Sequence, residues 1–260
     1  MKLCFSTLGC HDRTLEEIFS LAKKFNIDAL EIRGIAGELD NEKIACFSAK
    51  NAGGTKAAFA DVGVRPLVLG TSCTFHDPDG YENAIKEGYA AIEIAARIGF
   101  SAIRVFGDRI TQNDATGCIQ RVSEGVKALC DYASAFGIDV YLEVHGDFIT
   151  EQSLAPIIEA CGSHPRFGLI WDVCHTRNTY PDPRVFYDRF APYIRHVHLK
   201  DINGAQHVLP GEGTLPLEKI AKHLTKKGYN GYFSLEWERK WHPELPPIEE
   251  ALVRYFHIMK

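Results

Sequence analysis

The feature that most constrains the fold is the regular alternation of short apolar runs with longer helical patterns along the whole chain. Ala102–Phe106 follows a helical pattern over residues 81–98, and Ile138–Val144 follows another over residues 115–136. Gly99 stands at one of these returns from helix to strand, where glycine accepts a positive φ without steric cost. An alternation of this kind indicates parallel strands joined by crossover helices.

Eight such units can be counted, and Thr14 is a plausible N-cap for the first helix. The expected strands are Lys2–Leu8, Ala29–Ile32, Arg65–Leu69, Ala102–Phe106, Ile138–Val144, Phe167–Trp171, Ile194–Leu199 and Tyr232–Trp237. Because (β/α)8 barrels commonly occupy about 250 residues, the sequence predicts an α/β protein with a single TIM barrel domain over residues 1–260. An open doubly wound sheet is the alternative, but no GxGxxG motif follows the first strand. The unit at residues 34–63 is the least regular, because Gly53 and Gly54 interrupt its helix.

Composition and charge limit the classes of partner. The net charge of −5 disfavours nucleic acid and anionic membranes, because both require a basic surface. The eight cysteines are scattered without a CxxC pair, and no apolar run reaches the roughly 18 residues of a membrane span. The start of the chain has no signal-peptide core. We therefore expect a cytoplasmic protein with reduced thiols that acts on a small molecule, and a homo-oligomer is compatible with the sequence.

Four consecutive strands of the C-terminal half end in a carboxylate or an imidazole. Glu143, Asp172, His198 and Glu236 are separated by 29, 26 and 38 residues, each about one βα repeat. The active site of a barrel forms at the carboxyl ends of its strands, so these side chains are expected at one rim. Three carboxylates raise one another's pKa unless a cation lies among them. The pattern therefore predicts one divalent metal ion, with Mn, Mg or Co favoured and Zn or Fe compatible.

Two alternatives bear on this assignment. A single acidic residue at a strand end is most often solvated or caps the next helix, although four on successive strands argue against coincidence. Since side chains at i and i+2 share a strand face, His196 could replace His198, and Glu238 could replace Glu236. His145 shares the face of Glu143, one step nearer the loop, where it could orient a ligand, contact substrate or be exposed to solvent.

The motifs in this half of the chain resemble those of the xylose isomerase-like barrel superfamily, in its sugar (phosphate) isomerase/epimerase branch. They are LEVHGD at 142–147, WDVCH at 171–175, HVHLKD at 196–201, PGEG at 210–213 and GYNGYFSLEWE at 228–238. The N-terminal half matches mainly by its strand and helix rhythm and by IRVFGD at 103–108. The resemblance implies that Glu143, Asp172, His198 and Glu236 bind one metal, usually Mn, Mg or Co. It further implies that the two glutamates exchange protons with substrate and that His175 contacts it.

The chemistry implied by the resemblance follows general principles. A metal that chelates a carbonyl and an adjacent hydroxyl lowers the cost of removing the neighbouring carbon-bound proton, giving an enediolate. Carboxylates on both faces, Glu143 and Glu236, would permit epimerisation by deprotonation on one side and reprotonation on the other. One competent face would instead give isomerisation or loss of water.

Further residues are candidates for substrate binding: His175, Arg104, Lys200, His145 and Glu212. For Arg104 and Lys200 a surface salt bridge is the simpler interpretation, and Glu212 lies in a Gly-Glu-Gly turn that it could merely shape. Arg33, Arg104, Arg177 and Lys200 come from different loops and predict no compact phosphate cradle. The expected substrate is therefore an unphosphorylated sugar or keto-polyol.

Other functions remain open beside the metal-dependent isomerase or epimerase. An inosose-type dehydratase, or a lyase acting on an oxidised sugar, would use the same metal and enediolate. An apurinic-site endonuclease of the same superfamily would need additional zinc ligands, but Ala205 stands two residues before His207 where that class carries Asp. A non-catalytic sugar-binding barrel would not need the metal residues.

Overall fold

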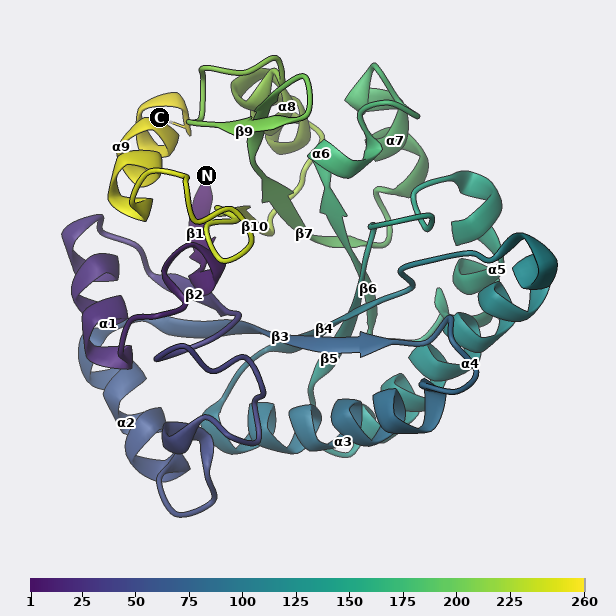
Figure 1. Cartoon of the computed structure of the whole chain (residues 1–260), viewed down its shortest axis with the longest axis horizontal. Helices are drawn as coiled ribbons and strands as arrows, with labels where there is room; N and C mark the ends of the chain where they lie inside the picture. The colour runs from purple at the N-terminus through teal and green to yellow at the C-terminus, as the bar shows by residue number, and fades with distance from the viewer. Residues whose placement is uncertain (260) are drawn as a thin grey trace.

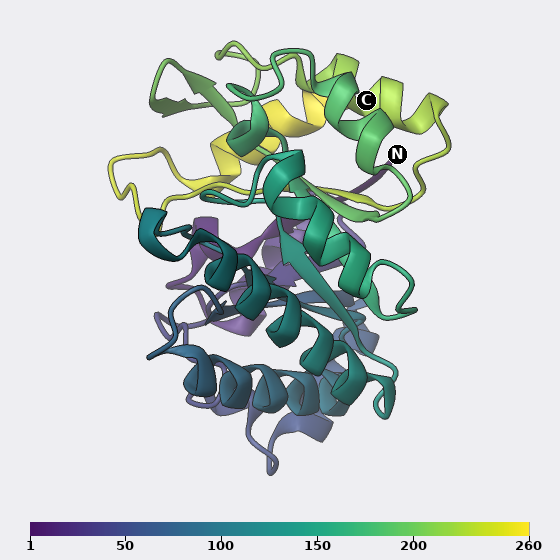
Figure 2. The same ribbon diagram turned by 90° about the vertical axis from the view of Figure 1, so that its right-hand side faces the viewer.

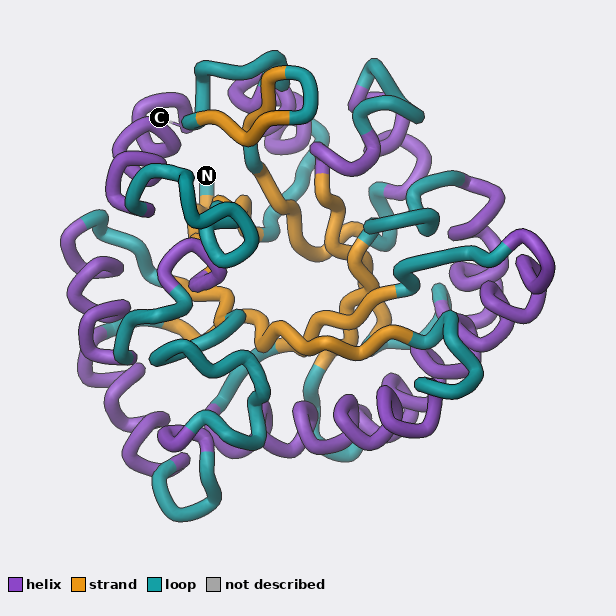
Figure 3. Tube along the Cα trace, in the orientation of Figure 1, coloured by secondary structure: helices purple, strands orange, loops and turns teal. Residues whose placement is uncertain are grey.

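The chain folds into a closed barrel of eight parallel strands surrounded by helices, as the sequence predicts (Figures 1 and 3). The computed structural model describes residues 1–259. The strands follow the order β1-β10-β7-β6-β5-β4-β3-β2 around the barrel. Their bounds are β1 Lys2–Ser6, β2 Ala29–Ile32, β3 Arg65–Thr74, β4 Ala102–Phe106, β5 Asp139–Glu143, β6 Phe167–Asp172, β7 Ile194–Leu199 and β10 Tyr232–Leu235.

The helices form the outer ring seen in Figure 1, and their buried apolar residues share one hydrophobic core with those of the strands. Their bounds are α1 Leu15–Lys24, α2 Ala52–Val62, α3 Tyr81–Ile98, α4 Ala115–Ser134, α5 Glu151–Cys161, α6 Val173–Thr176, α7 Pro183–Phe190, α8 Leu217–Lys226 and α9 Ile248–Met259. Thr14 caps α1 as expected, in a capping box in which Glu17 binds the backbone N–H of Thr14 in return. The barrel closes where β1 pairs with β10, and the Tyr255 hydroxyl of α9 donates to the Phe233 carbonyl there.

Strands β1, β5 and β10 end one or two residues earlier than expected, and the structure differs more at three further places. Strand β3 continues to Thr74 instead of ending at Leu69. Helix α2 begins at Ala52 and contains both glycines of the interrupted pattern. A hairpin of two short strands, β8 Asp201–Asn203 and β9 Gln206–Val208, follows β7 and was not predicted. In Figure 2 this hairpin (green) lies at the same side of the barrel as the loop after β10 (yellow-green).

Several strands bury apolar residues and carry a polar side chain at or directly after their carboxyl end. β6 is buried throughout, from Phe167 to Asp172, and β7 ends in the buried residues His198 and Leu199. Among residues 1–259, no helix is both long and apolar enough to cross a membrane. The barrel thus brings the polar ends of its strands together at one rim, where parallel-barrel active sites form.

Candidate active site

The four residues expected to hold a metal meet at one point. Glu143 ends β5, Asp172 ends β6, His198 lies in β7, and Glu236 directly follows β10. One ligand atom from each lies within 4.8 Å of those of the others. All four are buried, with at most 5% of each residue exposed. Four side chains from different strands therefore share one small, solvent-poor space.

The two glutamates are each held by a cation through one carboxylate oxygen. Arg104 donates from Nη1 to Oε2 of Glu143 at 2.8 Å, and Lys200 donates from Nζ to Oε2 of Glu236 at 2.7 Å. The other oxygens, both Oε1, lie 3.6 Å and 3.4 Å from Nδ1 of His198. Each glutamate thus keeps one oxygen directed at the shared space.

Asp172 divides its two oxygens in a similar way. Its Oδ1 accepts hydrogen bonds from the backbone N–H groups of Cys174 and His175, at 2.7 Å and 3.1 Å, and so caps α6. Its Oδ2 lies 2.7 Å from Nζ of Lys200. The helix start therefore fixes the rotamer of Asp172 and turns the second oxygen toward the site.

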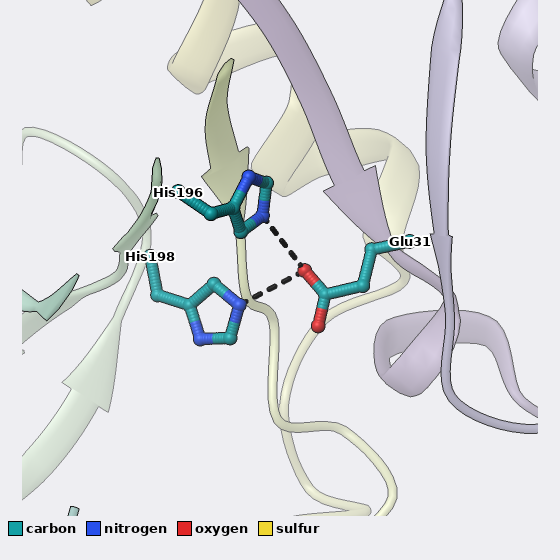
Figure 4. Close-up of side chains that lie close together, drawn as sticks. All are labelled: Glu31, His196 and His198. Carbon is teal, nitrogen blue, oxygen red and sulfur yellow. Dashed lines mark hydrogen bonds and ion pairs between the residues drawn. The ribbon is translucent and has the colours of Figure 1, made fainter. Parts of the chain in front are cut away.

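His198 is oriented by Glu31, which lies in β2, a strand that does not pair with β7. Nε2 of His198 lies 2.9 Å from Oε2 of Glu31, and the same oxygen lies 3.1 Å from Nε2 of His196 (Figure 4). The Ser234 hydroxyl donates to it as well, at 3.1 Å. With Nε2 directed at Glu31, the other ring nitrogen of His198, Nδ1, faces Oε1 of Glu143 and of Glu236. Nδ1 is buried and has no hydrogen-bond partner among residues 1–259.

Glu31 was not identified from the sequence, although a signal for it exists. It is the only charged residue in the fully buried strand Ala29–Ile32, and an unpaired buried carboxylate is costly. Glu31, His196 and His198 are also close enough together to be considered as metal ligands. Both imidazoles lie at hydrogen-bond distance from the same oxygen of Glu31. We therefore interpret the three residues as a hydrogen-bond network that supports the site.

Lys200 and Arg104 are buried site residues, which corrects the simpler expectation of surface salt bridges. Their side chains are 1% and 5% exposed. Lys200 lies between Asp172 and Glu236 and also contacts Glu238. Burial lowers the pKa of Lys200, but the three carboxylates outweigh burial and raise it well above its ordinary value. Lys200 therefore remains cationic and offsets the negative charge of the site.

The ionisation of the site follows from its charges. Burial and the charge of Glu236 raise the pKa of Glu143, but Arg104 and His198 outweigh them and lower it to about 2. Burial likewise opposes the ionisation of Glu236, and Lys200 and His198 hold its pKa well below the ordinary value. For His198, burial lowers the pKa, while Glu31, Glu236 and Glu143 raise it well above 6.5. Without a bound metal, Glu143 and Glu236 are therefore ionised and His198 is protonated.

A cavity of about 210 Å³ opens above this group. Arg33, Arg104, His145, His175, Lys200 and Trp241 line it together with both glutamates. Nε2 of His175 lies 3.5 Å from Oδ2 of Asp172 and 3.4 Å from Nζ of Lys200. The rings of His145 and His175 meet edge to face at 4.3 Å between centroids. Four of the residues expected to bind substrate are thus brought to one cavity.

The structure does not bring Glu212 to this cavity. Its exposed carboxylate accepts a hydrogen bond from Nη2 of Arg254 in α9 at 3.2 Å. The neighbouring turn is instead organised by Asp201, whose carboxylate accepts from the backbone N–H groups of Gly211 and Gly213. Arg177 also lies outside the cavity, while Arg33, from the end of β2, lies inside it.

The contacts in the structure distinguish His198 from His196 and Glu236 from Glu238, the alternatives left open by the strand register. Of the two histidines in β7, His198 faces the carboxylates and His196 contacts Glu31. Glu236 belongs to the four-residue group, whereas Glu238 lies two residues further on with His207 and His242, a second group whose spacing could hold a cation. Glu238 is already paired with Lys200.

The donor set of the four-residue group fits a divalent cation. Three carboxylates and one imidazole are ligands that Mg²⁺, Mn²⁺ and Zn²⁺ accept. The orphaned Nδ1 of His198 and the two Oε1 atoms of the glutamates face the same space. Glu31 would hold the ring as carboxylates commonly hold metal-binding histidines.

A closed parallel barrel with a polar cavity at the carboxyl ends of its strands defines a TIM-barrel enzyme architecture. The chain belongs to the xylose isomerase-like TIM barrel family, whose sequence model matches residues 19–255.

Among characterised relatives, the fructoselysine 3-epimerase of Escherichia coli O157:H7 is 28% identical over 122 residues. The aligned segment covers 45% of this chain and 44% of that enzyme, so it spans less than half of the relative's length.

Solved structures match over the whole barrel. D-psicose 3-epimerase with D-tagatose, from Clostridium cellulolyticum H10, superposes with a TM-score of 0.78, 19% identity and 100% coverage of both chains. The IOLI protein with a bound zinc atom superposes with a TM-score of 0.78 and 19% identity, covering 100% of this chain and 98% of that one. At this level of identity the likeness concerns the fold.

Proposed function

We propose that this protein is a divalent-metal-dependent isomerase or epimerase that acts on a small sugar or keto-polyol through an enediolate. The observation that carries the proposal is the meeting of Glu143, Asp172, His198 and Glu236 within 4.8 Å at the floor of a polar cavity. Family membership and the epimerases among the similar proteins support the same reaction class.

Glu143 and Glu236 are the proposed proton-transfer pair. Their strands, β5 and β10, are separated around the barrel by β6 and β7, so the two carboxylates approach the cavity from different sides. Both line the cavity, and both are ionised because Arg104 and Lys200 hold their pKa values down. One carboxylate can therefore accept a carbon-bound proton and release it to solvent, while the other takes a proton from solvent and delivers it to the opposite face.

The proposed metal would be held by Glu143, Asp172, His198 and Glu236, and when bound it would supply Lewis-acid stabilisation of the enediolate charge. The chain's own residues prepare this site. Glu31 orients the imidazole of His198, and the start of α6 orients Asp172. Lys200 and His175 stand beside the ligand group, where they can bind a substrate hydroxyl.

The size of the cavity supports a small substrate. Its volume of about 210 Å³ lies below the roughly 300–1,000 Å³ of pockets that enclose drug-sized ligands. Half-exposed Trp241 stands at its edge, from the loop after β10. A monosaccharide-sized molecule therefore fits the space better than an oligosaccharide.

Metal analysis followed by an activity screen tests the proposal. The purified protein is assayed for bound metal, stripped with a chelator, and reloaded separately with Mn²⁺, Mg²⁺ and Co²⁺ before incubation with ketoses and inososes. We expect one metal per chain at this site and interconversion of a ketose only after reloading. Turnover unaffected by complete metal removal would contradict the proposal.

A dehydratase is the second candidate, because two hydrogen-bond donors stand beside the ligand group. His175 lies half-buried between Asp172 and Lys200, and either His175 or Lys200 could donate a hydrogen bond to a departing hydroxyl. Product mass separates the two functions. An epimerase or isomerase conserves the substrate mass, whereas a dehydratase product is lighter by one water.

A further inference from the structure

Arg33 is a buried cation without a carboxylate partner. It directly follows β2, lines the cavity, and is 8% exposed. Its guanidinium donates to the Leu39 carbonyl at 3.1 Å and to the Ser72 hydroxyl at 2.8 Å, both neutral acceptors. Among residues 1–259, no carboxylate oxygen lies within 4.0 Å of it, whereas Arg104 is paired with Glu143 at 2.8 Å. A buried charge is costly unless an opposite charge accompanies it.

Arg33 and Arg104 converge on the same side of the cavity, over Gly70 in β3. A side chain added at Gly70 would lie 2.7 Å from Cδ of Arg33 and 2.9 Å from Nη2 of Arg104. Burial, and then the nearby charge of Arg104, lower the pKa of Arg33 to about 10, so it still carries its charge at neutral pH. Glycine at position 70 therefore leaves room for two like charges to line one wall.

The other two cations that line the cavity already have carboxylate partners. Arg104 is paired with Glu143, and Lys200 is paired with Asp172, Glu236 and Glu238. Of the lysine and arginine side chains that line the cavity, only Arg33 has no such partner within residues 1–259, so a negatively charged group on the substrate would supply it.

We propose that the substrate carries a carboxylate and that Arg33 binds it, so that the enzyme acts on a sugar acid or a polyhydroxy keto acid. This proposal rests on the proposed function. A guanidinium presents parallel N–H donors that match the two oxygens of a carboxylate. A carboxylate also supplies one negative charge, whereas a phosphate monoester carries nearly two at neutral pH. The proposal keeps the expectation of an unphosphorylated substrate and adds a carboxylate to it.

Binding measurements on the metal-loaded protein test the proposal. The probes are short hydroxy and keto acids, each beside its neutral counterpart, and they include D-glucuronate with D-glucose. Isothermal titration gives the Kd of each probe. A hydrogen bond to a charged group contributes about 1.5–3 kcal/mol. We therefore expect the best acid to bind roughly 10- to 150-fold tighter than its neutral partner. D-glucose 6-phosphate is the probe for phosphate recognition.

Variants assign the effect to Arg33. Arg33→Gln should abolish the preference for the acid, taken as the ratio between the Kd of the acid and that of its neutral partner, and metal content is measured beside it. Arg33→Lys should restore part of it, and Arg97→Gln, which removes an exposed cation from α3, should change neither Kd. A parent protein that binds no metal after loading would contradict the proposed function. A metal-loaded protein in which no acid is preferred, in which phosphate is preferred to the carboxylate, or in which Arg33→Gln keeps the preference would overturn this inference.

Discussion

Oε2 of Glu31 lies 2.9 Å from Nε2 of His198, across the interior of the barrel. Their strands, β2 and β7, are separated by β1 and β10, so the contact joins side chains that are not on paired strands. It decides which ring nitrogen of His198 faces the carboxylates, because the nitrogen that donates to Glu31 cannot bind a cation. The orientation of His198 is thus set by a residue outside the four-residue group.

Glu31→Gln should weaken metal binding, because the neutral amide holds the imidazole less firmly and makes the ring nitrogen that faces the site a poorer ligand. Loss of such a supporting carboxylate typically costs 10- to 100-fold in affinity, and we expect a change of about that size. The absorbance of bound Co²⁺ during titration measures it, with circular dichroism to confirm folding. Glu16→Gln, on the exposed face of α1, is the matched control. Equal Co²⁺ affinity in both variants would show that Glu31 has no positioning role.

Glu143→Gln and Glu236→Gln should each lower kcat by about 10²- to 10⁴-fold, the usual contribution of a positioned acid or base. Each variant retains an amide oxygen at the site, so metal content is measured beside turnover to separate the two effects. Glu159→Gln, on the exposed side of α5, provides the control. Near-normal turnover in both metal-loaded variants would remove the proton-transfer assignment and leave the metal site standing.

Lys200→Met should destabilise the metal-free protein more than the metal-loaded one. Removing the ammonium leaves Asp172, Glu236 and Glu238 facing one another, and breaking a buried ion pair typically costs about 3–5 kcal/mol. A bound dication would supply the missing positive charge. Urea unfolding with chelator and then with excess Mn²⁺ measures the difference, and exposed Lys219→Met serves as the control. Equal losses under both conditions would contradict this account of the charge balance.

Metal binding near pH 7 should release protons. The pKa of His198 is raised well above 6.5, so the bare imidazole is protonated at neutral pH and must lose about one proton to become a ligand. Because the shift is upward, the protonated ring stabilises the bare fold fully below pH 6.5, and this contribution disappears as the pH rises through the raised pKa. Calorimetric titration in buffers of different ionisation enthalpy counts the protons, and a count near zero at pH 7 would contradict the assignment.

Acid should destabilise the metal-free protein through its carboxylates. Their contribution to stability is lost as the pH falls, whereas that of His198 is lost as the pH rises. The pKa of Glu143 is lowered to about 2, so its contribution to stability is complete above its ordinary value of 4.5 and is lost as the pH falls from 4.5 toward 2. Urea midpoints measured through this interval should fall for the parent protein and fall less for Glu143→Gln. Parallel curves for the two proteins would show that Glu143 is not the group that titrates.

The barrel could be predicted from the sequence because its signals are local. Apolar runs, helical periodicity and glycines that follow the ends of helices, such as Gly99 and Gly137, repeat through the chain. Each of these signals depends only on residues that are close in the sequence. The hairpin after β7 was not predicted because its strands have three residues each and depend on pairing with one another. Strand β3 was expected to be shorter, because its final residues, through Thr74, lack the apolar character of its start.

The candidate site was predictable only where a residue ends a recognisable strand. Glu143, Asp172, His198 and Glu236 follow apolar runs in order, and the structure brings all four together. Glu31 could not be found in this way, since its partners come from the far side of the barrel. Similarly, nothing in the local sequence reveals that Arg33 and Arg104 converge over Gly70, or that Glu212 pairs with Arg254 at the periphery.

The double use of Asp172 restricts how the protein can change over evolution or by design. One oxygen caps α6 and the other faces the site, so substitution of this residue alters helix initiation and cation preference together. Asparagine would keep a capping oxygen but present an amide to Lys200, and glutamate would move both oxygens away from the N–H groups of α6. A redesign that seeks a different ion is therefore more tractable at Glu143 or Glu236, whose side chains do not begin a helix.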